Sequence, residues 1–308
     1  FDRLLYVAKL AVRILDNVVD MTDAPSEKVN TMFRANRRVG LGIMGFADML
    51  YQLHVPYDSE DGVKTAEKVM KCIQEAAHEM SQKLAEEKGQ FPHWDKSVYA
   101  KKGVKMRNAA LTNIAPTGTI SMIFDVSGGV EPYFALAYYY KGILGGATQL
   151  YYINKHLKRE LENYGVYSDE LMKRIVEEGT LKNIEDVPES VRNVFVTAMD
   201  IAPEGHIRVQ AAFQKYCDNS ISKTCNFPED ATKEDVLQGY LLAWELGCKS
   251  CTVYRNNSRQ LQVLNLNKQK NEEFVVQEEY DPQHQQKVVV AASNGSTHLA
   301  TCPECETL

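Results

Sequence analysis

Hydroxyl side chains and a glycine gather in residues 115–121, where the sequence runs Ala-Pro-Thr-Gly-Thr-Ile-Ser. The segment follows an apolar run at 109–114 that predicts a buried strand, and it leads into an apolar stretch that predicts a helix. The first N–H groups of a helix lack intrahelical acceptors and carry the positive end of the helix dipole. Gly118 lets the backbone approach a bound oxyanion, and the neighbouring hydroxyl groups, Ser121 included, add donors. The pattern therefore favours a turn that binds phosphate.

The residue types of this turn have a simpler explanation as well. The loop contains no lysine, so it does not match the Gly-Lys-Ser/Thr pattern of P-loop proteins. Threonine and serine also cap many helices that bind no ligand, so an ordinary helix cap accounts for the same residues. The turn alone does not decide between a phosphate site and a helix cap.

Other segments of the chain favour the binding site. They are Asn-Arg-Arg-Val-Gly-Leu-Gly-Ile-Met-Gly-Phe-Ala-Asp at 36–48, Val-Glu-Pro at 130–132, Ser-Lys-Thr-Cys-Asn-Phe-Pro at 222–228, Ala-Trp-Glu-Leu-Gly-Cys-Lys at 243–249 and Thr-Val-Tyr-Arg at 252–255. In this order and spacing they resemble the C-terminal half of the large subunit of ribonucleotide reductases. The likeness is greatest to the adenosylcobalamin-dependent (class II) enzymes that act on ribonucleoside diphosphates, and it covers roughly residues 1–262.

The resemblance implies a fold, a substrate and a cofactor. The expected fold class is α/β: the C-terminal half of the ten-stranded α/β barrel of ribonucleotide reductases, followed by a flexible C-terminal tail. The family's Pro-Thr-Gly-Thr-Ile segment holds the substrate phosphate, which assigns this role to Pro116, Thr117, Gly118, Thr119 and Ile120. The implied reaction converts ribonucleoside diphosphates to 2′-deoxyribonucleoside diphosphates by thiyl-radical chemistry, with adenosylcobalamin as cofactor.

The family's radical-bearing cysteine has no counterpart in this sequence. That cysteine lies in an Asn-Pro-Cys-Gly-Glu loop, which does not occur here, so we assign no catalytic residue. The sequence also starts at Phe1 inside a helical pattern, without an initiator methionine or a helix cap, which predicts a piece of a longer protein. We therefore expect the isolated chain to be inactive and the N-terminal half of the reductase to be its partner. The alternative is a non-catalytic fragment that only complements this separately encoded half.

Composition and charge argue against several classes of protein, namely nucleic-acid-binding, membrane-spanning and secreted proteins. The 308 residues carry 35 Lys and Arg against 41 Asp and Glu, a net charge of −6, so we predict no direct nucleic-acid partner. No apolar run approaches the roughly 20 residues that span a bilayer. The seven cysteines are odd in number and irregularly spaced, which argues against a secreted disulfide framework. We predict a cytoplasmic protein without a metal site, and a second copy of the chain as a further candidate partner.

Hydrophobic periodicity predicts an α/β arrangement of elements. Helical patterns cover 4–19, 29–38, 62–88, 149–164, 168–178, the segment that starts at Pro203, and 233–246; strand patterns cover 109–114, 220–226 and 250–255. Residues 193–201 fit either a strand or a helix end. The strand–helix–strand order at 220–255 predicts a βαβ unit, which implies parallel strands covered by helices.

The composition changes beyond the reductase-like segment, so we place the domain boundary at 1–262 and 263–308. Residues 267–286 are rich in Gln, Glu and Asn, which predicts a flexible linker.

The chain ends with a Cys-Pro-Glu-Cys pattern at Cys302 and Cys305, and class II reductases commonly carry cysteine-rich tails. The first interpretation is a redox pair that exchanges with thioredoxin or a glutaredoxin-like reductant. A truncated, unused tail is the second interpretation. The third is a zinc-binding tail that needs outside ligands such as His298.

Several other motifs are assigned structural roles. Gly40, Gly42 and Gly45 match the dinucleotide-binding fingerprint, but no hydrophobic strand precedes them. We predict instead that they allow close backbone packing, with Arg37 and Arg38 at the rim. A surface or packing role is predicted for His206. Buried core positions are predicted for Cys217, Cys225, Cys248 and Cys251, and a core or interface position is predicted for the tyrosines at 138–140.

Overall fold

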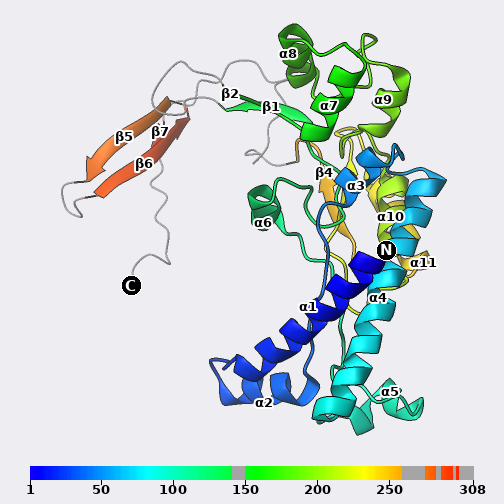
Figure 1. The fold of residues 1–308 in the computed structure, drawn as a ribbon. Helices are drawn as coiled ribbons and strands as arrows, with labels where there is room; N and C mark the ends of the chain where they lie inside the picture. Colours follow the sequence, from blue (N-terminus) through cyan, green and yellow to red (C-terminus); the bar gives the residue numbers. More distant parts are fainter. Residues whose placement is uncertain (141–149, 259–274, 282–285, 294–295, 298–308) are drawn as a thin grey trace. The chain divides into compact units, whose positions relative to one another are not determined.

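The computed structural model describes residues 1–140, 150–258, 275–281, 286–293 and 296–297. The chain divides into two compact units, Phe1–Asn265 and Leu266–Leu308. Figure 1 traces the fold from the N-terminus to the C-terminus. Within the described residues, no helix is both long enough and apolar enough to cross a bilayer.

Two long helices, α1 (Asp2–Met21) and α4 (Glu60–Lys88), pack along each other in the first unit (Figure 1). Both were predicted from apolar residues at helical spacing, and part of that apolar set is buried between them. Ser59 caps α4 by accepting a hydrogen bond from the Gly62 N–H. The two helices are connected through α2 (Glu27–Asn36) and α3 (Phe46–Gln52).

Four extended segments run side by side in parallel within the first unit. The pairings are Leu41 with Thr112, Ile114 with Ile221, and β3 (Thr224–Phe227) with β4 (Thr252–Arg255). The predicted strand at 109–114 is therefore extended, but it makes isolated bridges because its residues pair with two different neighbours. The predicted βαβ unit is confirmed, with α11 (Lys233–Glu245) between its two strands.

Helix α10 (Pro203–Gln214) contacts α4, β3 and α11, so it links the long helices to the parallel strands. It starts with Pro203 in its first turn, as predicted. Thr232 and Asp235 form a capping box that begins α11, because each side chain accepts from the other residue's backbone N–H. Gly247, with φ of 78°, follows the last turn of that helix.

The predicted helix at 149–164 is wrong for its first residues. Residues Leu150–Ile153 form β2, which pairs antiparallel with β1 (Ala137–Tyr140). Their Leu-Tyr-Tyr-Ile sequence is rich in residues that favour strands, and this preference outweighs the helical spacing. Helix α7 (Lys155–Asn163) begins only after Asn154, whose side chain accepts hydrogen bonds from two N–H groups of the first turn.

The remaining helices are short. They are η1 (Trp94–Lys96), α5 (Val98–Lys101), α6 (Gly118–Ile123), α8 (Asp169–Glu178) and α9 (Glu189–Val194). Helices α7, α8 and α9 share one apolar cluster with residues of α3 and β1. Because α9 ends at Val194, the helix-end alternative for 193–201 is confirmed.

In the second unit, β5 (Val275–Asp281), β6 (Gln286–Ser293) and β7 (Ser296–Thr297) form an antiparallel sheet. Strand β5 lies inside the segment 267–286 that composition predicts to be a linker, so that stretch is not without structure throughout. Its Val-Val pair is opposite the alanines that follow the Val-Val-Val run of β6. Such β-branched residues favour pairing even in a polar segment.

Candidate functional site

The predicted phosphate turn lies at the carboxyl end of the extended segment 109–114, where α6 begins. Parallel α/β structures commonly bind ligands at this end of their strands. No side chain among the described residues caps α6, and the N–H groups of a first helical turn have no acceptor within the helix. Four of the five predicted residues are exposed, and Thr117 is half-buried. A Cβ added to Gly118 would meet no atom within 4 Å, so the turn is open to a ligand.

The hydroxyl groups of the turn behave differently from one another. Thr117, with φ of 55°, uses its Oγ1 to accept a hydrogen bond of 2.7 Å from the Gly129 N–H. Ser121 is buried, and its hydroxyl donates to the Gly118 carbonyl oxygen at 3.0 Å. This contact stabilises the turn from inside, so the expectation that Ser121 offers a donor to a ligand is wrong. Thr119 remains the exposed hydroxyl at the start of α6.

Residues 127–131 lie against the phosphate turn and are called the backing segment; the sequence did not reveal how they are held. The Ser127 N–H donates to Asp48 Oδ2 at 2.7 Å, and the Ser127 hydroxyl oxygen accepts from the Ala47 N–H at 3.2 Å. Asp48 is buried and also accepts from the Tyr133 hydroxyl at 2.8 Å. Asp48 ends the motif at 36–48, but an acidic residue in a first helical turn is too common to reveal this contact.

The glycines that match the dinucleotide fingerprint allow close backbone packing, as predicted. A Cβ on Gly42 would lie 2.4 Å from the Asn113 carbonyl oxygen, next to the phosphate turn. Gly45, with φ of 77°, precedes α3 in a conformation that favours glycine. Arg38 is exposed as predicted, but Arg37 is buried, so its expected place at the rim is wrong.

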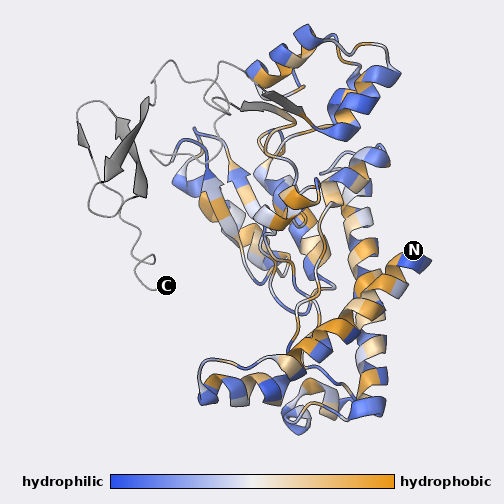
Figure 2. Ribbon diagram, turned by 60° about the vertical axis from the view of Figure 1, so that its left-hand side comes forward, coloured by the Kyte–Doolittle hydropathy of each residue, from blue (hydrophilic) through white to orange (hydrophobic). Residues whose placement is uncertain are grey.

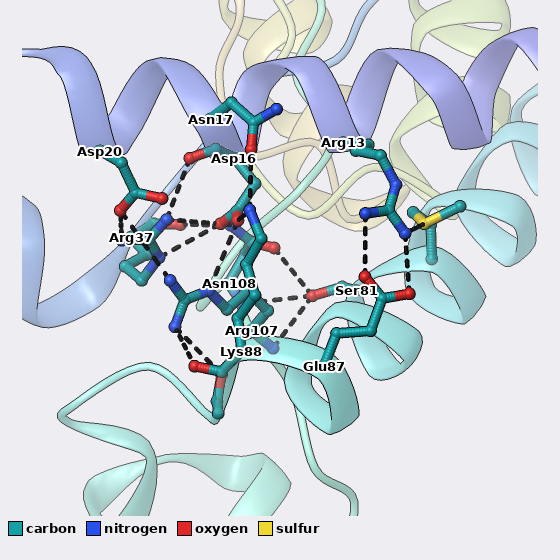
Figure 3. A network of polar contacts seen from close by, with 12 residues as sticks. Arg13, Asp16, Asn17, Asp20, Arg37, Ser81, Glu87, Lys88, Arg107 and Asn108 are labelled. Carbon is teal, nitrogen blue, oxygen red and sulfur yellow. Dashed lines mark hydrogen bonds and ion pairs between the residues drawn. The ribbon is translucent and has the colours of Figure 1, made fainter.

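Arg37 is buried because it binds a carboxylate inside the molecule (Figure 3). Its guanidinium donates to Asp16 Oδ1 at 2.7 Å and to Asp20 at 2.6 Å. Asp16 is 0% exposed and accepts from the Asn108 amide at 3.0 Å. Arg107 Nε lies 3.4 Å from Asp16 Oδ2, and the Lys88 ammonium also approaches that oxygen. The cluster therefore fixes α1 to the end of α4 and to the start of the segment that leads to the phosphate turn.

Lys223, whose side chain is fully buried, joins the backing segment to β3. Its ammonium lies 3.1 Å from Glu131 Oε2 and donates to the Thr224 carbonyl oxygen at 2.8 Å. The Thr224 N–H donates to Glu131 Oε1 at 2.5 Å, so both oxygens of this carboxylate are bound.

His206 is buried beside Lys223, so the packing role is confirmed and the surface alternative is wrong. Its Nε2 lies 2.9 Å from the Ala198 carbonyl oxygen and its Nδ1 lies 2.8 Å from Lys223 Nζ. Burial, followed by the neighbouring positive charge, lowers the pKa of His206 to about 3. The imidazole is therefore neutral near pH 7, which suits packing rather than proton transfer.

The core positions predicted for the cysteines are confirmed for Cys217 and Cys225, whereas Cys248 and Cys251 are less buried than predicted. Cys217 and Cys225 are buried, and Cys248 and Cys251 are half-buried against the βαβ unit. Burial raises the pKa of Cys225 to about 12 and that of Cys248 to about 11, so these thiols stay protonated near pH 7.

Cys302, Cys305 and His298 lie outside the described residues. The tyrosines at 138–140 belong to β1. No cluster of three or more His, Cys, Asp or Glu side chains that could hold a metal ion occurs in the part of the chain that the structure describes.

Comparison with known proteins identifies the family of this site. A family model described as "Ribonucleotide reductase, barrel domain" matches residues 1–107 and 101–254. The chain belongs to the ribonucleotide reductase family. The resemblance inferred from the motifs at 36–48 and 115–121 is thereby confirmed, and the α/β barrel is the fold to which this part of a reductase contributes.

Two curated reductases are similar over most of the chain. The chain is 46% identical over 264 residues to a vitamin B12-dependent ribonucleoside-diphosphate reductase of Thermoplasma acidophilum, covering 86% of this chain and 34% of that protein. It is 44% identical to the protein of the same name from Mycobacterium tuberculosis, covering 86% of this chain and 38% of the relative. The chain thus spans about a third of the length of these reductases.

A solved structure shares the fold. The class Id ribonucleotide reductase alpha subunit of Actinobacillus ureae superposes with a TM-score of 0.71 at 26% sequence identity. The match covers 81% of this chain and 46% of that subunit. The α/β fold class predicted from the sequence is therefore confirmed.

Proposed function

We propose that this chain supplies the substrate-phosphate site of an enzyme that converts ribonucleoside diphosphates to 2′-deoxyribonucleoside diphosphates. The observation that carries the proposal is the open turn at 116–120, where an uncapped helix start meets the carboxyl end of a parallel segment. Both curated relatives named above are ribonucleoside-diphosphate reductases, which supports a diphosphate as the bound group. A bound diphosphate would accept hydrogen bonds from the first N–H groups of α6 and from the Thr119 hydroxyl.

The chain's own residues would bind and orient the substrate, and the thiyl-radical chemistry would belong to the rest of the enzyme. The five assigned residues are Pro116, Thr117, Gly118, Thr119 and Ile120. Orientation matters because a small displacement of the reacting sugar costs rate heavily.

We propose adenosylcobalamin as the cofactor of the assembled enzyme, because both curated relatives are named vitamin B12-dependent. One cavity in the described part of the chain is too small to enclose this cofactor. A cavity of about 390 Å³ is lined by Pro56, Asp58, Thr180, Lys182, Arg192, Asn193, Val196 and Asp200. Cavities of roughly 300–1,000 Å³ suit drug-sized ligands, and adenosylcobalamin is larger than these.

The proposed partners follow from the same assignment. They are a ribonucleoside diphosphate, the N-terminal half of a reductase, a second copy of the chain, and thioredoxin or a glutaredoxin-like reductant. We also propose a cytoplasmic location, which suits the free thiols of the five described cysteines.

If Cys302 and Cys305 carry electrons, replacing both by serine should abolish thioredoxin-driven turnover but not turnover driven by a small dithiol. Turnover with thioredoxin that survives this double change would exclude the redox tail.

A chimera tests the proposed phosphate site. This chain would replace the matching 264-residue region of the Thermoplasma acidophilum reductase. Reduction of a ribonucleoside diphosphate would then be measured with adenosylcobalamin and a dithiol. Thr119→Val should raise the Michaelis constant by the equivalent of ~1–2 kcal/mol, the usual cost of losing a hydrogen bond to a charged group. Gly118→Val should raise it further, because its side chain would fill the open space of the turn. Unchanged Michaelis constants in both variants would make the turn a helix cap only.

A complementing, non-catalytic fragment is the second candidate function. Exposed apolar side chains on α11 favour it: Leu237, Tyr240, Leu241 and Trp244. Such a face suits a protein partner. Co-expression with the preceding region of the Mycobacterium tuberculosis relative should give a complex that purifies together but does not reduce nucleotides. Nucleotide reduction by that complex would exclude the non-catalytic role.

A further inference from the structure

The ammonium of Lys223 has all of its hydrogen-bonding capacity engaged inside the protein. It contacts Glu131 Oε2 at 3.1 Å, His206 Nδ1 at 2.8 Å and the Thr224 carbonyl oxygen at 2.8 Å. An ammonium carries three N–H donors, so each contact accounts for one of them. The side chain is 0% exposed, and it is therefore held in a single position.

The protonation state of the neighbouring His206 shows which of the three Lys223 contacts is an ion pair. His206 Nε2 faces the Ala198 carbonyl oxygen at 2.9 Å, and a carbonyl can only accept. The Nε2 must therefore hold the proton, which leaves Nδ1 as an acceptor for Lys223. Glu131 is consequently the anionic partner of Lys223 within the described residues.

Glu131 in turn fixes the segment that backs the phosphate turn. Its second oxygen accepts from the Thr224 N–H, and its own N–H donates to the Gly128 carbonyl oxygen at 2.9 Å. The preceding residue, Val130, is held through its carbonyl oxygen by the Tyr57 hydroxyl. The end of the segment is thus bound to β3 and to the chain that precedes α4.

Residues 127–131 pack so tightly against the phosphate turn that no additional side-chain atom would fit between the two backbones. The Gly129 N–H donates to Thr117 Oγ1 at 2.7 Å. A Cβ on Gly128 would lie 3.0 Å from the Pro116 carbonyl oxygen, and one on Gly129 would lie 2.9 Å from the Ala115 carbonyl oxygen. Backbones this close cannot shift independently, so movement of 127–131 would move the turn.

We propose that Lys223 is a positioning residue for substrate phosphate: through Glu131 it holds residues 127–131 against the turn at 116–120. Lys223 does not itself touch the substrate in this arrangement, because its donors are all bound within the protein. The proposal rests on the proposed function for its substrate, but the mechanical link between Lys223 and the turn does not.

Amide hydrogen exchange on the full 308-residue chain tests the mechanical link without any substrate. Lys223→Met should speed exchange at Gly129 and Glu131 by about 10-fold or more, because Glu131, whose side chain is 25% exposed, would lose its cation and turn toward solvent. Amides in the middle of α4 should keep their protection. Lys215→Met is the matched control, since Lys215 pairs with Glu67 on the exposed surface. Unchanged exchange at Gly129 and Glu131 in Lys223→Met would overturn the proposal.

The chimeric reductase tests the consequence for the substrate. Lys223→Met should raise the Michaelis constant for the ribonucleoside diphosphate by about 10-fold and change kcat less, the split expected from weakened binding. The double variant Lys223→Met with Glu131→Gln removes the buried cation together with its partly exposed carboxylate, so it should recover melting temperature relative to Lys223→Met without recovering the Michaelis constant.

These outcomes separate the two proposals. If the double variant recovers both the melting temperature and the Michaelis constant, Lys223 only stabilises the fold. Faster exchange in Lys223→Met with an unchanged Michaelis constant would show the same. If the phosphate-turn variants leave the Michaelis constant unchanged, the proposed function fails, and the exchange experiment still decides whether Lys223 holds the turn.

Discussion

Buried charged side chains hold together the parts of this chain that surround the phosphate turn. Asp16 accepts from Arg37 and Asn108 inside the molecule, and Glu131 accepts from Lys223 next to the turn. Removing one member of a buried pair leaves the other charge without compensation, which costs more than the pair itself contributes. Single substitutions at these residues should therefore have large effects on stability.

Asp16→Asn should destabilise the chain by about 3–5 kcal/mol, because it removes the fully buried carboxylate that faces Arg37, Arg107 and Lys88 and leaves the buried Arg37 guanidinium with the half-exposed Asp20 alone. Urea unfolding monitored by circular dichroism measures the change. Asp23→Asn is the matched control: Asp23 pairs with Arg34 on the surface and should lose at most about 1 kcal/mol. Equal losses in the two variants would contradict the assignment of Asp16 as a buried charge centre.

The stability of the parent chain should fall with decreasing pH in part because of His206. Its pKa is lowered from 6.5 to about 3 in the folded state, so the unfolded chain binds the proton more readily between these values. The contribution of neutral His206 to the free energy of unfolding is fully present at pH 7 and falls as the pH drops below 6.5. The total loss amounts to at most ~5 kcal/mol. In His206→Asn, unfolding free energy measured from pH 7 to pH 4 should depend less steeply on pH than in the parent. Identical slopes would show that His206 is not buried in neutral form.

At the scale of elements, the site depends on close contacts of residues 113–117 with the loop after Leu41 and with the backing segment that follows α6. Gly42 lies against Asn113, and Gly128 and Gly129 lie against the residues that open the phosphate turn. Each contact joins positions far apart in the sequence, so it requires a small residue at one place and a fixed backbone at the other.

Gly42→Ala should destabilise the chain by about 2–3 kcal/mol, because its Cβ would lie 2.4 Å from the Asn113 carbonyl oxygen and force a backbone shift. Gly118→Ala serves as the control, since a Cβ there meets nothing within 4 Å and should not lower stability. Thermal melting of both variants measures the difference. An unchanged melting temperature for Gly42→Ala would refute the close packing of these loops.

The sequence predicts elements better than it predicts the contacts between them. Apolar spacing located α1, α4, α10 and α11, and Pro203 marked a helix start. The strand β2 was missed because four residues are too few to show a period against the helical pattern that follows them. The burial of Arg37 and the role of Asp48 were also missed, since partners at a distance in sequence leave no local pattern.

At the scale of the whole first unit, apolar residues are not confined to the interior. Figure 2 shows hydrophobic residues along α1, and one side of this helix packs on α4. The apolar side chains that remain exposed follow helical spacing: Val7, Leu10, Ile14, Val18 and Met21. An exposed stripe of this kind favours association.

The purified chain should self-associate through this stripe. Leu10→Glu combined with Ile14→Glu should reduce the average mass in light scattering without lowering the melting temperature, because both side chains are exposed. Lys173→Glu changes the net charge by the same amount at an exposed position of α8, outside the stripe, so it should leave association unchanged. Equal effects of the two changes would point to charge rather than to the apolar stripe.

The Asp16 cluster also sets an order of events during synthesis. Asp16 emerges 21 residues before Arg37, 72 before Lys88 and 92 before Asn108. At roughly 5–20 residues per second, the ribosome needs on the order of 5–20 s to supply the whole set. Until then the carboxylate of Asp16 stays hydrated, because its buried partners are not all present. The surface against which the apolar side of α1 packs is also incomplete. The nascent chain therefore carries an unfinished, aggregation-prone helix until Asn108 is made, and it is in this interval that a chaperone would be most useful to it.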